Sequence, residues 1–456
     1  MNKTKISETM AEMEKAWLVG IQFQGNTISS PGNGSFINNS SNSYREGYSR
    51  ISGKDNVSLH LNELEALLDT LEVKAAGRTI APLKKPSAAL LLGRGKTEEI
   101  IAQAKEAESD LIVFDEDLSP TQQRNWERAS GLKVIDRQEV IINIFADRAR
   151  TKEASLQVEL ASCKYHLPRL AGAWQHLSRQ RGGSYGTKGE GEKQIELDKR
   201  LLLKKIAKLK EELEEVKKQR GTMRKLRTGK KLFTCAIAGY TNSGKSTLLN
   251  SLTGSDLNAN NRLFDTLDPA TRNLRLTGGR EIIITDTVGF IRKLPHQLVE
   301  AFQSTLEETL IADLIILLLD ASGSEVKNHY EASMDVLREI GADKNKRLIV
   351  FNKIDLCDDD LSLSMLKKDF PGSVFISAGK GENLIQLEKE IEKAASENDS
   401  EIYLLIPPSR YELIQLIRKT GILVSEEYTE KGALIEAIVP GYILPQLDQY
   451  SIEKPE

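Results

Sequence analysis

The sequence predicts a multidomain α/β protein, and three observations lead to this fold class. Short apolar runs alternate with amphipathic segments over most of the 456 residues, as strands and helices do in α/β domains. A glycine-rich turn near residue 240 follows one apolar run and opens a helical segment. In the middle of the chain, apolar residues recur at alternating spacings of four and three, which is typical of paired helices. A chain of this length has room for about three domains.

The glycine-rich turn fits the phosphate-loop pattern G-x-x-x-x-G-K-[ST]. It lies between a predicted strand at 232–238 and a predicted helix at 246–252, so its backbone N–H groups would cradle phosphates. A lone match would also suit an ordinary glycine turn, but the strand and helix around it favour phosphate binding. We expect Lys245 to reach the β- and γ-phosphates and the Ser246 hydroxyl to bind Mg²⁺. The predicted binding residues are Gly239, Tyr240, Thr241, Asn242, Ser243, Gly244, Lys245, Ser246 and Thr247.

A second motif follows a predicted strand at 281–285. It comprises Asp286, Thr287, Val288 and Gly289. We expect Asp286 to hold Mg²⁺ through water and the Gly289 N–H to face the γ-phosphate. Alone, the motif would suit an ordinary turn after a strand, but after a phosphate loop it predicts the second part of a nucleotide site.

A third motif follows a predicted strand at 347–351, where open α/β sheets bind ligands. It comprises Asn352, Lys353, Ile354 and Asp355. The Asp355 carboxylate can accept hydrogen bonds from both N1–H and the exocyclic amine of guanine, a pair of donors that adenine lacks. We expect the Lys353 stem to cover the base, Asn352 to hold the loop, and Ser377-Ala378 to supply a backbone contact. The three motifs predict a P-loop GTPase domain that binds GTP rather than ATP.

Between the first two motifs lies a polar stretch at 258–272 without strand or helix periodicity. A GTPase needs a threonine here to complete the Mg²⁺ shell and sense the γ-phosphate, and we expect Thr266, with Thr271 as the alternative. The predicted nucleotide contacts in this stretch are Phe264, Asp265, Thr266, Leu267 and Asp268. The predicted catalytic residues are therefore Lys245, Thr266 and Gly289, and the predicted metal ligands are Ser246, Thr266 and Asp286.

Phe290 occupies the position where many GTPases carry a glutamine that orients water. Its ring cannot hydrogen-bond water, so we expect slow hydrolysis until another group supplies that order; packing of the ring under the neighbouring segment is compatible with this. Asn242 is a candidate for holding K⁺ beside the phosphates, and its alternative role is to stabilise the loop turn. Arg292 is a weaker candidate for neutralising charge.

Residues 164–231 are strongly basic, with 20 Lys and Arg against 8 Asp and Glu, in a chain whose net charge is −3. Heptad patterns at 156–167 and 195–216 flank a glycine-rich connection at 182–191 and predict an antiparallel helical hairpin. Basic residues mixed with aromatic rings suit RNA, whose bases stack on rings. A solvated coiled-coil surface is the alternative. The candidate RNA contacts are Arg169, Trp174, Arg179, Arg181, Tyr185 and Lys188.

The two ends of the chain predict smaller domains. Near the N-terminus we expect strands at 15–21, 88–92, 111–114 and 133–135, helices at 59–71, 96–107 and 120–129, and a flexible insertion at 25–50. The turn at 93–96 could bind an anion or a second nucleotide, but a plain turn is the favoured interpretation. The tail from residue 401 predicts a compact α+β domain.

Composition limits the compartment. The longest apolar run, at 314–319, is too short to span a membrane, and the N-terminus is too polar for a signal peptide. Cys163, Cys235 and Cys357 are odd in number and unpaired in spacing, as in a reducing cytosol. We therefore expect a cytoplasmic protein without membrane contact, and a monomer.

Together these features resemble the HflX family of ribosome-associated GTPases. The resemblance covers nearly the full chain and rests on the stretches at 134–137, 156–161, 165–170, 189–192, 264–269 and 286–292. It implies binding to the large ribosomal subunit and its RNA, GTPase stimulation by that subunit, and splitting of stalled ribosomes under stress. It supports Thr266 as the switch threonine and implies, as in some relatives, ATP use by the N-terminal domain. Glu190 and Lys193 depart from the proline and threonine that relatives commonly carry, and the 25–50 insertion is long.

The predicted domains are an N-terminal α/β domain (1–148), a basic helical hairpin (149–230), a P-loop GTPase domain (231–397) and a small C-terminal α+β domain (398–456). The predicted function is Mg²⁺-dependent GTP hydrolysis by a factor that associates with the large ribosomal subunit and splits or rescues stalled ribosomes. One alternative is a GTPase that assembles the large subunit. Another is a GTP-controlled switch whose hairpin binds a protein coiled coil.

Overall fold

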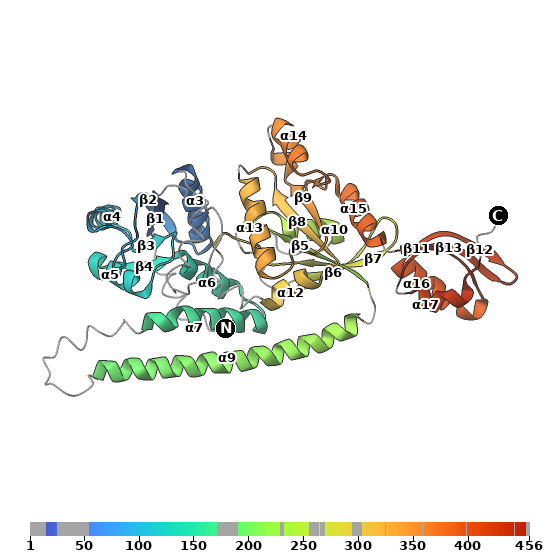
Figure 1. Cartoon of the computed structure of the whole chain (residues 1–456), viewed down its shortest axis with the longest axis horizontal. Coiled ribbons are helices and arrows are strands. Elements are labelled where there is room, and N and C mark those ends of the chain that lie inside the picture. The colour runs from blue at the N-terminus through green and yellow to red at the C-terminus, as the bar shows by residue number, and fades with distance from the viewer. Residues whose placement is uncertain are drawn as a thin grey trace, which may run out of the picture. The chain divides into compact units, whose positions relative to one another are not determined.

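The computed structural model describes residues 15–24, 54–170, 190–228, 232–254, 264, 270–293, 303–323, 325–357, 360–397, 399–441 and 443–452. They form two compact units, which divide between Leu213 and Glu214. The first unit holds one sheet and the second unit holds two (Figure 1). This architecture confirms the predicted multidomain α/β class, while the four domain limits stay predictions.

The first sheet is fully parallel, with strand order β2-β1-β3-β4. Its strands are β1 (Lys15–Phe23), β2 (Lys74–Leu83), β3 (Leu111–Phe114) and β4 (Lys133–Asp136). The helices of this region are α3 (Lys54–Thr70), α4 (Arg94–Glu106), α5 (Pro120–Ser130) and α6 (Arg137–Arg148). All four residues of β3 are buried, as expected of a parallel strand covered on both faces. Helix α5 begins with a capping box between Ser119 and Gln122, which fixes the chain direction after β3.

The predicted strand at 88–92 is wrong. That stretch is a turn closed by a bridge between Ser87 and Leu91, and its leucines are apolar because Leu91 and Leu92 pack into the core. The strand of this region is β2, which among the described residues is an edge strand paired with β1, and its sequence mixes small and polar residues without a continuous apolar run. Consequently no strand leads directly into the 93–96 turn, because the 84–92 segment lies between β2 and this turn. Arg94 and Lys96 instead lie in α4, where they pair with Glu98 and Glu99.

The predicted helical hairpin is present as α7 (Lys152–Leu170) and α9 (Glu190–Thr228). The two helices lie side by side in Figure 1, and Lys205 Nζ lies 2.6 Å from Glu159 Oε1. Six of the predicted heptad positions of the first unit are buried: Leu156, Leu160 and Cys163 on α7, and Ile206, Leu209 and Leu213 on α9. Leu167 and Leu202 are only half-buried. Helix α9 already includes Gly191, so the glycine-rich connection ends earlier than predicted. The rest of that connection lies outside the described residues.

The second sheet has the order β10-β9-β8-β5-β7-β6, in which only β6 is antiparallel to its neighbour. Its strands are β5 (Phe233–Gly239), β6 (Ala270–Arg275), β7 (Glu281–Asp286), β8 (Leu314–Asp320), β9 (Arg347–Asn352) and β10 (Val374–Phe375). The helices of this region are α10 (Lys245–Thr253), α12 (Gln303–Ile311), α13 (Val326–Glu339), α14 (Asp360–Asp369) and α15 (Leu384–Ser396). Because β5, β7 and β9 are parallel, their carboxyl ends meet at one edge, and the three sequence motifs follow these ends.

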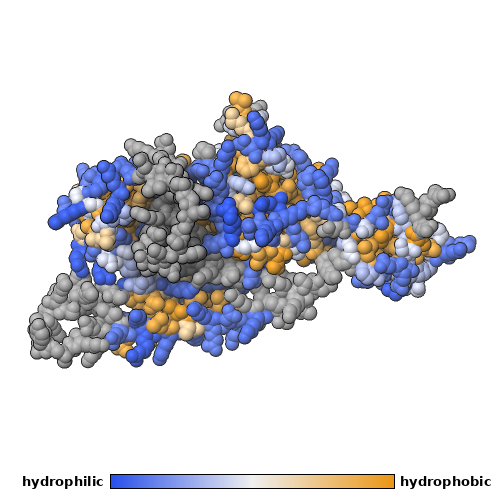
Figure 2. Space-filling view, in the orientation of Figure 1, coloured by the Kyte–Doolittle hydropathy of each residue, from blue (hydrophilic) through white to orange (hydrophobic). Residues whose placement is uncertain are grey.

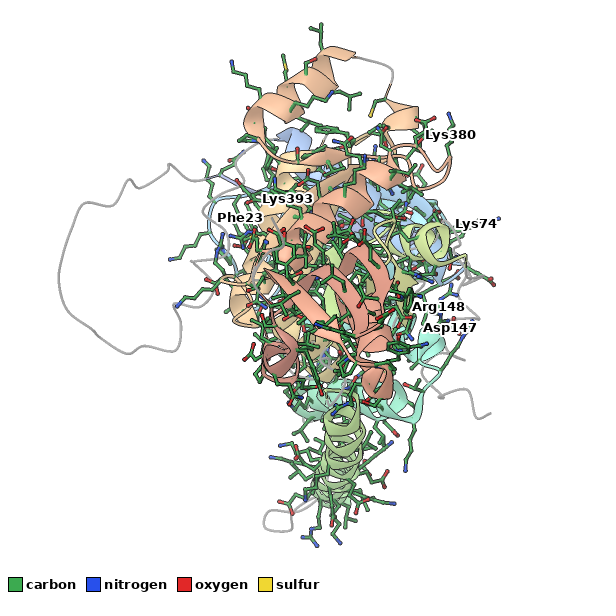
Figure 3. All side chains as sticks on the ribbon, turned by 90° about the vertical axis from the view of Figure 1, so that its right-hand side faces the viewer. Phe23, Lys74, Asp147, Arg148, Lys380 and Lys393 are labelled. Carbon is green, nitrogen blue, oxygen red and sulfur yellow. The ribbon has the colours of Figure 1, made fainter. Side chains whose placement is uncertain are left out.

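The third sheet is antiparallel, with the order β11-β13-β12. It consists of β11 (Asp399–Ile406), β12 (Ile422–Thr429) and β13 (Gly432–Pro440), and Figure 3 turns it toward the viewer. Helix α16 (Glu412–Thr420) buries Leu413, Ile414 and Ile417 in the core of this sheet, and α17 (Leu444–Leu447) adds Leu447. This is the expected α+β domain.

Apolar side chains are exposed on α14, where Figure 2 shows hydrophobic residues on the surface of the second unit. Leu361 is 67% exposed and Met365 is 65% exposed. Among the described residues, no helix combines the length and apolar character that crossing a membrane would need.

Candidate nucleotide site

The glycine-rich turn after β5 forms a tight loop against the third motif. Gly244 has a φ of 91°, and a Cβ there would lie 2.3 Å from Asn352 Nδ2. Only glycine therefore suits this position. Helix α10 begins at the next residue, Lys245, so the loop presents a helix N-terminus to the space above the sheet.

Polar groups of this loop are buried with hydrogen-bonding capacity to spare. Among the described residues, the hydroxyls of Thr241 and Ser243 have no hydrogen-bond partner, although these two residues are only 6% and 1% exposed. Lys245 Nζ donates to the Tyr240 carbonyl at 2.9 Å. Burial lowers the pKa of Lys245 to about 8, against the opposing influence of Asp286. Buried donors without acceptors are costly, and phosphate oxygens would supply the acceptors.

The first two motifs meet through Ser246 and Asp286. The Ser246 hydroxyl donates to Asp286 Oδ2 at 2.7 Å, and Asp286 is fully buried. These are hard oxygen ligands of the kind Mg²⁺ prefers, so the residues fit the ion expected from the sequence. The described residues contain no cluster of three His, Cys, Asp or Glu side chains for a metal. Mg²⁺ takes few protein ligands and would supply charge neutralisation beside substrate phosphates.

The third motif is fastened to the loop through Asn352. Its Nδ2 donates to the Ser243 carbonyl at 2.8 Å, and its Oδ1 accepts from the Ala378 N–H at 2.9 Å. The side chain therefore joins three predicted site segments, as expected for a residue that holds the loop. Lys353 has a φ of 63°, and its Nζ lies 2.7 Å from Asp320 Oδ2.

Asp355 is prepared to accept hydrogen bonds. The Ser377 hydroxyl, followed by Lys380, keeps the pKa of Asp355 below its usual value, so the carboxylate stays ionised. Lys380 Nζ lies 3.7 Å from Asp355 Oδ2, and Figure 3 shows this lysine at the periphery of the molecule. An ionised acceptor at the carboxyl end of β9 suits the paired donors of guanine.

The second motif runs along the phosphate loop. Thr241 N–H donates to the Phe290 carbonyl at 2.7 Å, and Phe290 N–H donates to the Gly239 carbonyl at 2.9 Å. A Cβ on Gly289 would lie 3.0 Å from Lys245 Nζ, so its backbone is close to the predicted phosphate ligands. The Thr287 hydroxyl is used internally, on the Ile237 carbonyl. Phe290 is 1% exposed and packs, as sequence allowed.

The switch residues are only partly described. Asp265, Thr266, Leu267 and Asp268 lie outside the described residues, whereas Phe264 is buried with a φ of 58°. Thr271 lies in β6, and its hydroxyl is 3.1 Å from that of Thr285. The role of Thr266 therefore stays a prediction.

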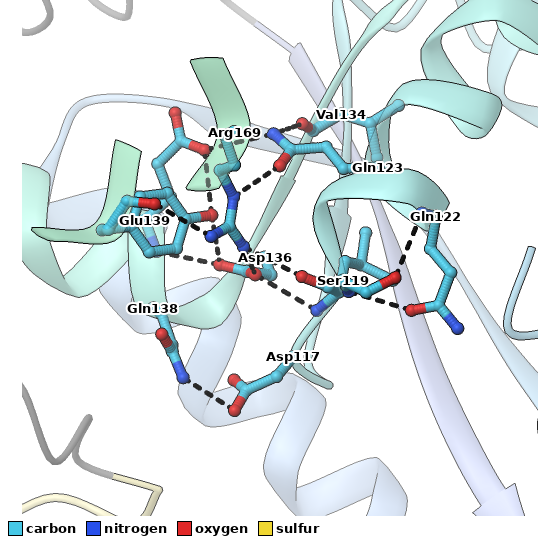
Figure 4. Close-up of polar contacts among 11 residues, drawn as sticks. Asp117, Ser119, Gln122, Gln123, Val134, Asp136, Gln138, Glu139 and Arg169 are labelled. Carbon is cyan, nitrogen blue, oxygen red and sulfur yellow. Dashed lines mark hydrogen bonds and ion pairs between the residues drawn. The ribbon is translucent and has the colours of Figure 1, made fainter. Parts of the chain in front are cut away.

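Among the candidate RNA contacts, Trp174, Arg179, Arg181, Tyr185 and Lys188 lie outside the described residues. Arg169 lies in a polar cluster shown in Figure 4, where its Nη2 is 3.0 Å from Asp136 Oδ2 and its Nε donates to Gln123 Oε1 at 2.8 Å. The guanidinium also lies 3.5 Å over the Tyr165 ring. Arg169 is thus engaged by its own unit, and its contact with RNA stays a prediction.

Three residues near the site were absent from the sequence prediction. Asp320 ends β8 and holds Lys353, and its place after a buried strand could have revealed it. Glu325 binds Arg292, and the His329 ring stacks on Tyr240 with 4.0 Å between centroids. The last two lie at the start of α13, in no recognisable motif.

Three family models match consecutive parts of the chain. They are described as "GTP-binding GTPase N-terminal" at residues 58–146, "GTP-binding GTPase Middle Region" at 148–227 and "50S ribosome-binding GTPase" at 234–353. The last match spans the phosphate loop and the second motif and ends within the third.

Curated relatives are similar over most of their length. The GTPase HflX of Akkermansia muciniphila is 43% identical over 413 residues, covering 86% of this chain and 93% of the relative. The GTPase HflX of Lacrimispora saccharolytica is 44% identical, covering 85% and 91%. The GTPase HflX of Escherichia coli is 40% identical, covering 79% and 86%. With this similarity and a phosphate loop joined to a guanine motif, the chain belongs to the HflX family of GTPases and hydrolyses GTP.

Proposed function

We propose that the protein is a GTP-dependent factor that binds the large ribosomal subunit and splits or rescues stalled ribosomes under stress. The observation that carries the proposal is the match of residues 234–353 to a family described as a 50S ribosome-binding GTPase. The basic hairpin adds support, since ribosomal RNA is a polyanion.

The hairpin is the proposed RNA-binding element. Exposed lysines of α9, such as Lys199, Lys204 and Lys208, would meet phosphates, and the rings of Trp174 and Tyr185 would stack on unpaired bases. Arg179, Arg181 and Lys188 would add phosphate contacts near the connection.

Hydrolysis is proposed to depend on the bound subunit. Lys245, Gly289 and Thr266 would stabilise the charge that develops on the γ-phosphate, with Ser246, Thr266 and Asp286 as ligands of Mg²⁺. These groups act on the phosphate and on Mg²⁺ and are not proposed to orient the attacking water. The Phe290 ring offers no hydrogen bond for that purpose. We therefore propose that ordering by the subunit supplies what the chain lacks.

The test compares GTP turnover with and without large subunits, followed by sedimentation of intact ribosomes incubated with protein and GTP. We expect turnover to rise at least tenfold with subunits, and intact ribosomes to separate. Replacing Arg179, Arg181 and Lys188 by alanine should reduce the stimulation, while replacing the exposed Lys84, Lys85 and Lys105 should not. If intact ribosomes persist while precursor particles bind, the protein is an assembly factor. If the protein instead binds a coiled-coil partner with an affinity that does not change with salt concentration, the GTP-controlled protein switch would be favoured.

K⁺ binding by Asn242 is a separate proposal, supported by the exposed position and the φ of 59° at this residue. Turnover should be faster in K⁺ than in Na⁺ buffer, and the Asn242→Ala variant should lose that difference. Equal rates for the parent protein in both buffers would rule the ion out.

We further propose a cytoplasmic monomer; the cytoplasmic location is supported by cysteines that form no disulfide in the described structure. ATP binding by the N-terminal domain is a proposal that rests on the family resemblance alone.

A further inference from the structure

The chain segment after Gly289 is tied to the start of α13 by an ion pair. Arg292 Nη2 donates to Glu325 Oε2 at 2.7 Å, and Nη1 donates to Oε1 at 3.1 Å. The two side chains are 12% and 13% exposed. Burial is the largest single influence and would raise the pKa of Glu325, but the hydrogen bonds and charge of Arg292, with a hydrogen bond from Asn328, together lower that pKa, so the pair is charged. A bidentate pair of this kind fixes orientation as well as distance.

A second contact joins the same segment to the phosphate loop. The Arg292 backbone N–H donates to the Tyr240 hydroxyl at 2.9 Å. The Tyr240 ring is 4% exposed and stacks on His329 of α13, with 15° between the ring planes. Tyr240 belongs to the phosphate loop, so the loop, the segment after Gly289 and α13 are connected through one set of side chains.

These contacts restrain the segment that directly follows Gly289, the predicted sensor of the γ-phosphate. Phe290, the next residue, pairs with the loop through two backbone hydrogen bonds, and two residues further along Arg292 is held by Glu325 and Tyr240. A restrained segment loses less conformational freedom when it closes on a ligand. GDP has no γ-phosphate to contact Gly289, so this smaller loss of conformational entropy strengthens the binding of GTP and not of GDP.

We propose that Arg292, Glu325 and Tyr240 form a clamp that positions Gly289 for the γ-phosphate and thereby favours GTP over GDP. Arg292 acts in this clamp as a positioning residue. Its guanidinium is already bound by Glu325, which distinguishes the clamp from direct neutralisation of phosphate charge.

The test measures dissociation constants for GDP and for a non-hydrolysable GTP analogue, with single-turnover hydrolysis, in the full-length Arg292→Gln and Glu325→Gln variants. Both should bind the analogue about tenfold more weakly, change GDP affinity less than about twofold, and hydrolyse more slowly. The exchanged pair Arg292→Glu with Glu325→Arg should recover part of the loss. Tyr240→Phe, which removes only one hydroxyl, should shift the same ratio by a smaller factor.

The matched control is Lys327→Gln, which breaks an exposed ion pair of α13 with Asp369, 2.7 Å apart, and should change neither affinity. Two results would overturn the clamp. Equal weakening of GDP and analogue binding by the variants would indicate a merely structural pair. Faster hydrolysis in Glu325→Gln would indicate that freed Arg292 acts on the phosphate directly.

Discussion

Two buried polar clusters of this protein lie near the carboxyl ends of parallel strands, one in each unit, and they differ in how their polar groups are satisfied. In the nucleotide site, the hydroxyls of Thr241 and Ser243 are buried and have no hydrogen-bond partner in the described part of the chain. In the N-terminal cluster of Figure 4, Asp136 accepts from Arg169 and from the Tyr165 hydroxyl, at 3.0 and 2.9 Å. The polar groups of the first cluster can form further hydrogen bonds, whereas those of the second cluster are paired with one another. We call the first the open cluster and the second the closed cluster.

The difference separates a ligand site from an internal lock. Buried donors are retained without partners where a ligand completes them, because otherwise their desolvation cost is uncompensated. Arg169 also donates to the Leu118 carbonyl at 2.9 Å, so α7 is joined to the loop before α5 by a charge that the cluster neutralises. Two clusters with similarly polar sequences thus have different roles: one binds a ligand and the other stabilises the fold.

The largest effect is expected from a substitution in the open cluster. The Lys245→Ala variant should lower GTP hydrolysis by at least about 100-fold, because a preorganised charge at the transferred phosphate is lost. The ligand-free variant should unfold at no lower temperature, since the substitution removes an ammonium whose burial is costly. Single-turnover hydrolysis and thermal unfolding measure the two effects. Near-parental hydrolysis would show that the loop does not bind the phosphates.

A second large effect tests the base. The Asp355→Asn variant should bind GTP about 100-fold more weakly, because an amide cannot accept from both guanine donors. Its Nδ2 would instead suit the C2 carbonyl of xanthine, so binding of xanthosine triphosphate should improve. Competition binding with both nucleotides checks this, and the neighbouring Lys380→Gln serves as a control that should leave the preference for guanine intact.

The nucleotide site was largely predictable because its residues are adjacent in sequence and follow strand ends. The strand at 111–114 and the helix at 120–130 were predictable for similar local reasons, namely a continuous apolar run and a Ser-Pro helix start. Asn352 was expected to hold the loop, and its two hydrogen bonds do so.

What could not be predicted depends on long-range partners. The edge strand β2 contains Gly77 and Pro82, and its many small residues leave no apolar run or alternation that would predict a strand. Arg169 suggested RNA because basic residues surround it in sequence, but its carboxylate partner lies 33 positions earlier. Glu325 likewise meets Arg292 only in three dimensions.

The closed cluster should respond in stability rather than catalysis. The Arg169→Ala variant should lose about 3–5 kcal/mol of unfolding free energy, because Asp136 is left buried without its cation. Basal GTP hydrolysis per folded molecule should be unchanged. Denaturant unfolding checks this, with the exposed Arg128→Ala on α5 as the control. Unchanged stability combined with weaker RNA binding would instead make Arg169 an RNA contact.

The smallest expected effect is proton uptake on GDP binding, which should occur in the open cluster and not in the closed one. The Lys245 pKa of about 8 in the ligand-free protein should rise when phosphate charge arrives, so GDP binding at pH 8 should take up about half a proton. Because binding raises the pKa, affinity is unaffected well below pH 8 and falls as pH rises through it, by about threefold between pH 7.5 and 8.5. Calorimetry in buffers of different ionisation enthalpy measures this uptake. Lys245→Arg keeps its proton at every pH used and should take up none, so equal uptake in both proteins would assign the proton to another group. Glu139, whose pKa burial raises to about 7, lies in the closed cluster and should not contribute, because no ligand charge reaches it there.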